Sequence, residues 1–284
     1  MKLGLAISPF RSSFPYIVYN GCDLDAALAE ISTLGYEGVD FFSGWLDDEE
    51  VRSLADKFLA AGMKVVNYLP IALSATGSSF SDVVDSRRLS YVEGYQQEMD
   101  KGAILGTEYM PIGFSRGMKA ADRSWKHYFV SLADSVRRLT DYGRPLGIRL
   151  ALEPINRFEV NTLNTTLECL EFLDACGLDE TMLLLDQFHM NIEDPDIGET
   201  IKAARGRIGH FHAADSNRAG AGKGHCDFDL LVGALSSVGY DAYLSMEAKP
   251  QGTPYECARD CAAFLAPKIQ AAATTVTPAK GGIQ

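Results

Sequence analysis

Eight short apolar runs recur along the 284-residue chain, separated by longer stretches that also carry polar residues. We expect strands at residues 3–8, 38–43, 64–69, 109–114, 148–153, 182–186, 208–212 and 242–247. Residues 25–35, 49–62, 87–106 and 124–143 have the pattern of amphipathic helices, and each ends on a glycine, as a helix C-terminus commonly does. Strands that alternate with helices predict βαβ units and a parallel sheet.

The spacing of these units favours a closed barrel over an open sheet. Eight units in about 268 residues give roughly 33 residues each, the size of one βαβ step, which suits a (β/α)8 TIM barrel of about 250 residues. An open dinucleotide-binding sheet is disfavoured because the segment SPFRSSFP after the first strand lacks the glycine fingerprint, and no Walker lysine motif occurs. We predict a single catalytic barrel domain over residues 1–268 and a disordered tail over residues 269–284, which lack apolar periodicity.

The charge balance disfavours two classes of partner. Asp and Glu number 38 against 26 Lys and Arg, which gives a net charge of −12. A field of this sign repels nucleic-acid backbones and anionic lipids, so we expect neither nucleic acid nor membrane as a partner. No segment reaches the roughly 18 apolar residues of a membrane helix, and the N-terminal apolar run is too short for a signal peptide. We therefore expect a cytoplasmic protein with six structural cysteines.

Polar residues end four consecutive predicted strands in the second half of the chain. Each of the four follows an apolar run, and their separations of 33, 26 and 35 residues are about one βα unit apiece: Glu153, Asp186, His212 and Glu247. Any one of them alone could equally be a helix-capping or ion-paired side chain instead of a metal ligand. A charge at the end of a buried strand nevertheless costs several kcal/mol unless it is paired or metal-bound. Together the four predict a site of oxygen and nitrogen ligands that suits Mn²⁺, Mg²⁺ or Co²⁺.

Further polar residues follow the same strands. Glu159, His189 and Arg218 lie within six residues of three of the strand ends, in loops that we expect to crown the site. His210 lies two residues before His212, so both side chains point to the same side of the pleat. We interpret His210 as a structural or supporting residue.

Four blocks of the sequence carry a family resemblance: LEPINRFE, LDQFHMNIED, GHFHAADSNR and VGALSSVGYDAYLSMEA, which span about residues 150–248. In order and spacing they resemble the D-tagatose 3-epimerase and D-psicose (allulose) 3-epimerase family, within the xylose-isomerase-like TIM barrels. The resemblance implies a metal ion held by Glu153, Asp186, His212 and Glu247, with Mn²⁺ first and Co²⁺ or Mg²⁺ as alternatives. It also implies a homodimer or homotetramer.

The resemblance further implies an isomerase that interconverts free ketohexoses or ketopentoses at C3. Glu153 and Glu247 are the implied catalytic pair, exchanging the C3 proton through a cis-enediolate that the ion stabilises. This suits the chemistry, since a hydrogen beside a ketone is a weak acid and epimerisation needs a base on one face and an acid on the other. Glu159, His189 and Arg218 are implied to hold substrate hydroxyls or to support the carboxylates, and Arg218 is a candidate to orient Glu153 or a substrate oxygen.

The loop after the fourth predicted strand, GFSRGMK, departs from the family because it lacks the tryptophan expected near the sugar. Phe114, together with Phe10 and Phe14, is a candidate to stack on the substrate instead. Trp45 follows the second strand and is a weaker candidate at the rim.

Two functions remain open. The first is a metal-dependent ketose 3-epimerase, and the alternative is an aldose–ketose or hydroxypyruvate-type isomerase that moves the proton between adjacent carbons. Arg116, Lys119 and Lys249 raise the alternative of an acidic or phosphorylated substrate, although solvated surface cations are the simpler interpretation. A DNA-directed phosphodiesterase on the same barrel is disfavoured by the charge of −12.

Overall fold

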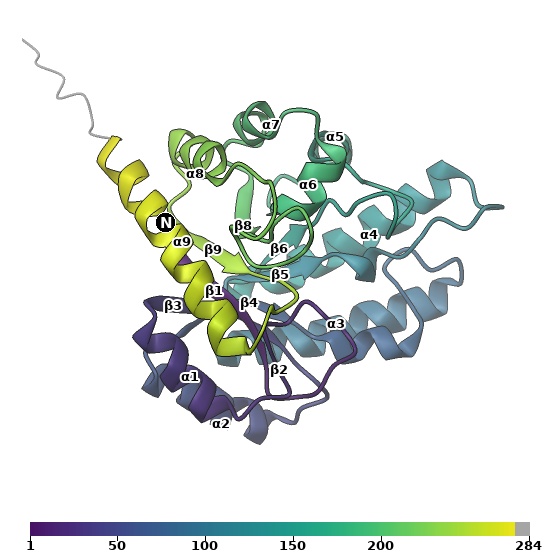
Figure 1. Cartoon of the computed structure of the whole chain (residues 1–284). Coiled ribbons are helices and arrows are strands. Elements are labelled where there is room, and N and C mark those ends of the chain that lie inside the picture. The colour runs from purple at the N-terminus through teal and green to yellow at the C-terminus, as the bar shows by residue number, and fades with distance from the viewer. Residues whose placement is uncertain (276–284) are drawn as a thin grey trace, which may run out of the picture.

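The computed structural model describes residues 1–275, in which eight parallel strands close into a barrel surrounded by helices (Figure 1). The barrel strands are β1 (Lys2–Ser8), β3 (Tyr36–Phe42), β4 (Lys64–Leu69), β5 (Tyr109–Ile112), β6 (Arg149–Leu152), β7 (Met182–Asp186), β8 (Ile208–His212) and β9 (Tyr243–Met246). The barrel closes where residues 2–5 of β1 pair with residues 243–246 of β9. A two-residue strand, β2 (Tyr19–Asn20), pairs with the end of β1. The predicted fold class is confirmed.

Four barrel strands are shorter than predicted at the end that faces the site, and β3 ends one residue early at Phe42. Strand β5 ends at Ile112 because the chain turns at Gly113 and Phe114–Arg116 form a 3-10 turn, η2. Strands β6 and β9 end one residue before Glu153 and Glu247, so these two side chains stand just beyond the ladder. The proline that follows Glu153 has no N–H with which to extend the strand.

Helices cover the outside of the barrel (Figure 1). They are α1 (Leu24–Thr33), α2 (Asp48–Ala60), α3 (Asp85–Leu105), α4 (Trp125–Gly143), α5 (Thr166–Ala175), α6 (Gln187–Glu193), α7 (Ile197–Ala203), α8 (Phe228–Ser237) and α9 (Pro254–Thr275), with 3-10 turns η1 (Ile71–Thr76) and η3 (Arg144–Leu146). Helix α6 directly follows β7, where we expected a loop, because the carboxylate of Asp186 accepts the Phe188 N–H at the helix start. Among the described helices, none is long and apolar enough to cross a bilayer.

The C-terminal boundary of the predicted barrel domain falls too early. Helix α9 packs on α1 and α8 and continues to Thr275, so the expected disorder is wrong for residues 269–275. The alanine-rich run favours helix, and Ala272 is buried against the core, which keeps the last turns in place. The rest of the predicted tail, residues 276–284, lies outside the described residues.

Because all eight barrel strands are parallel, their C-terminal ends meet at one face of the barrel. A cavity of about 450 Å³ opens there, lined by residues from the loops after several strands. The fold therefore brings the predicted site residues, which are spread over almost a hundred positions of the sequence, to one place.

Candidate active site

The four predicted ligand residues come together at the mouth of the barrel. Nδ1 of His212 lies 3.6 Å from Oε2 of Glu247 and 4.0 Å from both Oε1 of Glu153 and Oδ2 of Asp186. One ligand atom each from Glu153, Asp186 and His212 lies within 4.8 Å of the others. Asp186 is fully buried, and the side chain of Glu153 is 12% exposed towards the cavity that it lines. This is the grouping that the strand ends predict.

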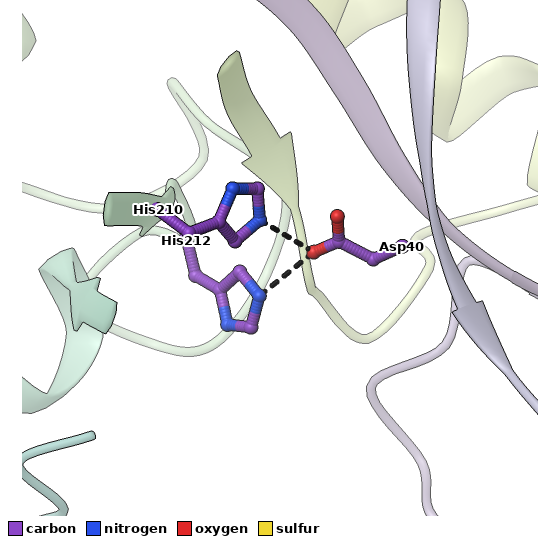
Figure 2. A group of neighbouring side chains, drawn as sticks. All are labelled: Asp40, His210 and His212. Atoms are coloured by element: carbon purple, nitrogen blue, oxygen red, sulfur yellow. Dashed lines mark hydrogen bonds and ion pairs between the residues drawn. The ribbon is translucent and has the colours of Figure 1, made fainter. Parts of the chain in front are cut away.

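His212 is oriented by a residue that the sequence analysis missed. Asp40 on β3 is fully buried, and its Oδ2 lies 2.8 Å from Nε2 of His212 and 2.9 Å from Nε2 of His210 (Figure 2). Its Oδ1 accepts a hydrogen bond from Ser245 on β9 at 2.9 Å. Burial alone would raise the pKa of Asp40, but His210 and His212 lower it well below the usual range. An ionised carboxylate only accepts, so both histidines donate through Nε2.

This network leaves Nδ1 of His212 free to bind a cation. Nδ1 is buried and has no hydrogen-bond partner among the described residues, although it faces three carboxylates. A nitrogen in that position, together with carboxylate oxygens, is a donor set that fits a divalent ion. Asp40, His210 and His212 also lie close enough to hold an ion. Their facing atoms are already satisfied by hydrogen bonds to one another, which favours a supporting role and agrees with the interpretation of His210.

The carboxylates differ in their affinity for protons. Burial, and then the neighbouring charge of Glu247, raise the pKa of Glu153 to about 8. Burial also raises the pKa of Glu247, even though His212 and Arg218 oppose it. Burial opposes ionisation of Asp186 too, but Arg218, His189 and His212 outweigh it and lower the pKa. The site thus holds one firmly ionised carboxylate, Asp186, beside two glutamates whose pKa is raised.

Arg218 bridges two of these carboxylates. Nη1 donates to Oδ2 of Asp186 and Nη2 donates to Oε2 of Glu247, so the carboxylates that Arg218 contacts directly are these two and not Glu153. The other expected role of Arg218, to hold a substrate oxygen, stays a prediction. Its guanidinium lies between two rings, 4.5 Å from the centre of Tyr16 and 4.8 Å from that of Phe188. Arg218 reaches this position from a left-handed backbone conformation, φ 59°, in the loop after β8. The ion pairs and the two rings together hold the Arg218 guanidinium at the cavity.

His189 reaches the cavity from α6, rather than from the loop that we expected. Nε2 lies 3.9 Å from Oε1 of Glu153 and 3.9 Å from Oδ2 of Asp186. The amide nitrogen of Asn156 lies 2.8 Å from Nδ1 and also donates to Glu159 at 2.8 Å. Nδ1 therefore accepts, and the Nε2 proton points to the carboxylates. Burial lowers the pKa of His189 to about 3, so this donor is a neutral ring.

Glu159 does not line the cavity, and its place in the site is indirect. It accepts from Asn156, which in turn fixes the ring of His189. Asn156 was not among the predicted site residues, although it lies inside the family-like block LEPINRFE.

None of the three basic residues that suggested an acidic or phosphorylated substrate lines the cavity. Arg116 is fully buried and donates to backbone carbonyls, so both expectations for it, a rim cation and a solvated cation, are wrong. Lys119 lies with its ammonium 5.0 Å from the centre of the Trp125 ring, and neither Lys119 nor Lys249 lines the cavity. This arrangement does not favour a charged substrate.

Two of the three predicted phenylalanines border the cavity. Phe14 and Phe114 line it, whereas Phe10 does not. Phe14 stacks on Phe42, with 5.6 Å between ring centres, and forms an apolar wall. Trp45 is 60% exposed and lies outside the lining.

Comparison with known proteins agrees with this geometry. A family model described as xylose isomerase-like TIM barrel matches residues 28–267. An L-ribulose 3-epimerase of Mesorhizobium japonicum is 32% identical over 232 residues, covering 80% of this chain and 75% of that protein. A D-psicose 3-epimerase of Agrobacterium fabrum is 33% identical over 177 residues, covering 62% of this chain and 57% of that protein.

A solved structure of an L-ribulose 3-epimerase superposes over 99% of each chain with a TM-score of 0.81 at 24% identity, which shows the shared fold. The resemblance that the four sequence blocks predict is confirmed by these matches. The chain belongs to the xylose isomerase-like TIM barrel family.

Proposed function

We propose that this chain is a metal-dependent ketose 3-epimerase that acts on free ketohexoses or ketopentoses. The observation that carries the proposal is the placement of Glu153 and Glu247, which both line the cavity and both approach the unpartnered Nδ1 of His212. Relatives that share a third of their aligned residues are L-ribulose and D-psicose 3-epimerases, which supports a ketose as substrate.

The residues that would hold the ion are Glu153, Asp186, His212 and Glu247. Three carboxylates and one imidazole favour Mn²⁺, with Co²⁺ or Mg²⁺ as alternatives. When bound, such an ion lowers the energy of the negative charge that develops on the ketose oxygens as the C3 proton leaves.

The side chains of this protein perform the proton transfer itself. Of Glu153 and Glu247, the ionised one removes the C3 proton and the protonated one returns a proton to the opposite face, and the roles reverse in the other direction. Burial raises the pKa of both glutamates, which favours a protonated partner for this exchange. Arg218 and the neutral Nε2–H of His189 are donors for substrate oxygens, and the wall that includes Phe14 keeps water from the far side of the sugar.

The isomerase alternative uses the same two carboxylates but reprotonates a neighbouring carbon. The two carboxylates serve either reaction, and what supports epimerisation is that the relatives are named L-ribulose and D-psicose 3-epimerases. We further propose that the protein works in the cytoplasm as a homodimer or homotetramer. Light scattering of the purified protein tests the oligomeric state.

The test uses a panel of ketoses and ketose phosphates, assayed with Mn²⁺, Co²⁺ and Mg²⁺ after chelation and read by NMR of the product in deuterated water. We expect a C3 epimer that carries deuterium at C3, and we expect Glu153→Gln and Glu247→Gln each to abolish the exchange. An aldose product would favour the isomerase. Full turnover by chelated protein would overturn the metal dependence.

A further inference from the structure

Arg116 is a buried cation without a carboxylate partner. Its side chain is fully buried, and no ion pair joins it to an acidic group among residues 1–275. Burying a guanidinium in this way is costly unless its N–H groups are well satisfied. By contrast Arg88, a buried arginine of α3, pairs with Asp134 at 2.7 Å. Contacts other than an ion pair must therefore stabilise the buried guanidinium of Arg116.

The guanidinium of Arg116 instead binds three backbone carbonyls. Nη1 donates to the carbonyl of Glu153, and Nη2 donates to the carbonyls of Thr162 at 3.0 Å and Leu163 at 3.3 Å. Leu163 has a left-handed backbone, φ 51°, which a branched residue rarely adopts. Arg116 thus ties the end of β6 to the loop that leads into α5.

Glu153 needs such a tie because the strand ladder stops there. Its N–H donates to the carbonyl of Ile112 on β5 at 3.1 Å, but the next residue is a proline and offers no N–H to continue the pairing. The donor from Arg116 holds the carbonyl side of the same residue. Both faces of the Glu153 backbone are then fixed by β5 and the turn that follows it.

The same turn also fits the side chain of Glu153. A methyl group added at Gly113 would lie 2.7 Å from Oε2 of Glu153, so a side chain there would displace the Glu153 carboxylate. The turn is itself anchored, because Ser81 donates to the carbonyl of Arg116 at 2.7 Å and the Phe80 N–H donates to that of Ser115 at 2.9 Å. The segment from residue 113 to 116 therefore surrounds Glu153 from backbone to carboxylate.

We propose that Arg116 is a positioning residue that holds the Glu153 carboxylate in register with Glu247 across the cavity. This rests on the proposed function, in which both carboxylates act on the same carbon. Displacing a reacting group by about 1 Å costs on the order of 100-fold in rate, so a residue that never touches substrate controls turnover here. The sequence pattern gave no sign of this role, because GFSRGMK is where the chain departs from its family.

The test compares Arg116→Met and Arg116→Lys with the matched control Arg88→Met, which removes an equally buried arginine between α3 and α4. We expect Arg116→Met to lower kcat about 100-fold with KM changed less than about threefold, and to weaken Mn²⁺ binding about tenfold by titration calorimetry. Arg116→Lys, which keeps the charge and some donors, should lower kcat by about tenfold, a smaller loss than in Arg116→Met. Arg88→Met should lower the melting temperature but leave kcat and Mn²⁺ affinity within about twofold.

Equal effects of Arg116→Met and Arg88→Met on kcat and on Mn²⁺ affinity would overturn the positioning role. If Arg116→Met does not fold, wild-type kcat and Mn²⁺ affinity in Arg116→Lys would do so. Failure of the proposed function looks different, because wild-type protein would then exchange no C3 hydrogen with any ketose. In that case the Mn²⁺ affinities still decide whether Arg116 positions Glu153.

Discussion

Nε2 of His212 lies 2.8 Å from Oδ2 of Asp40, a residue 172 positions earlier in the chain. The ionised carboxylate fixes which ring nitrogen donates and so presents Nδ1 to Glu153, Asp186 and Glu247. Such outer contacts tune a metal site nearly as strongly as the ligands themselves.

Asp40→Asn should therefore weaken Mn²⁺ binding by about 10- to 100-fold. The amide is neutral, so the negative charge that fixes both histidines as donors is lost. Titration calorimetry on chelated protein measures the affinity. Glu98→Gln is the control, since Glu98 on α3 is also a buried carboxylate. It accepts hydrogen bonds from Tyr68 on β4 and from Lys101 on α3. Unchanged affinity in Asp40→Asn would show that His212 does not depend on Asp40.

Much of this candidate site follows from the sequence because its proposed ligands end apolar strands. The ends of β7 and β8 fall at the predicted residues Asp186 and His212, where an ionisable side chain closes an apolar run. The same rule predicted Glu153 and Glu247 as the last residues of their strands, and each strand ends one residue before them. Their spacing by one βα unit was enough to bring all four to one face.

The supporting residues could not be predicted in this way. Asp40 lies within an apolar strand, and its meaning depends on His210, which is 170 positions away. Arg116 resembled a surface cation because no pattern in the sequence shows that three carbonyls surround it. Asn156 was overlooked beside the more reactive Glu159, although it is the amide that touches the histidine. Such roles arise from tertiary contacts, which periodicity does not encode.

Asn156→Leu should impair turnover through His189. Without the side-chain amide, Nδ1 is left with the longer 3.4 Å hydrogen bond from the backbone N–H of residue 156, so the ring is held less firmly with its Nε2 proton towards Glu153 and Asp186. We expect kcat/KM to fall about 10- to 100-fold, the usual effect of losing a supporting hydrogen bond at a site. Steady-state kinetics with the best ketose of the panel provide the measurement.

The control for this variant is Asn161→Ala, which removes an exposed asparagine that bonds only the backbone of Lys119. It should keep kcat/KM within about twofold, as surface substitutions usually do. Comparable losses in both variants would mean that the loop, and not His189, is responsible.

Asp215→Asn should loosen the loop that carries Arg218. The carboxylate of Asp215 accepts backbone N–H groups from Ser216 at 2.7 Å, Gly222 at 2.9 Å and Cys226 at 3.1 Å. Losing these charge-assisted bonds should lower the free energy of unfolding by about 1.5–3 kcal/mol at pH 7. Because Arg218 sits on the same loop, kcat should fall as well.

The pH dependence of this effect follows from the pKa of Asp215. Burial would raise that pKa, but the backbone N–H groups lower it overall. The folded protein then binds fewer protons at this group than the unfolded chain, so the stabilisation is present above about pH 4 and is lost as the pH falls through the lower folded pKa. Urea unfolding of wild type and Asp215→Asn should converge in acid. Asp227→Ala, which removes the N-cap of α8, should lower stability without lowering kcat.

Mn²⁺ binding should release protons and strengthen as the pH rises. In the metal-free protein, burial and Glu247 raise the pKa of Glu153 to about 8. Burial lowers the pKa of His212, but Glu247, Asp40 and Glu153 outweigh it and raise that pKa to about 10. An ion coordinates only the deprotonated forms, so below pH 8 it must displace a proton from each group. At pH 7 we expect about two protons released for each ion, and affinity that falls more than about tenfold for each pH unit below 7.

Calorimetry in buffers of different ionisation enthalpy counts these protons. Glu153→Gln should release about one proton fewer than wild type, because its amide holds no proton for the ion to displace. Glu159→Gln is the matched control, since it changes a carboxylate six residues away that lies outside the cavity lining, and it should release as many protons as wild type. Binding without proton release at pH 7 would mean that the ion does not use Glu153 and His212 together, and the ligand set proposed from the four strand ends would then have to be abandoned.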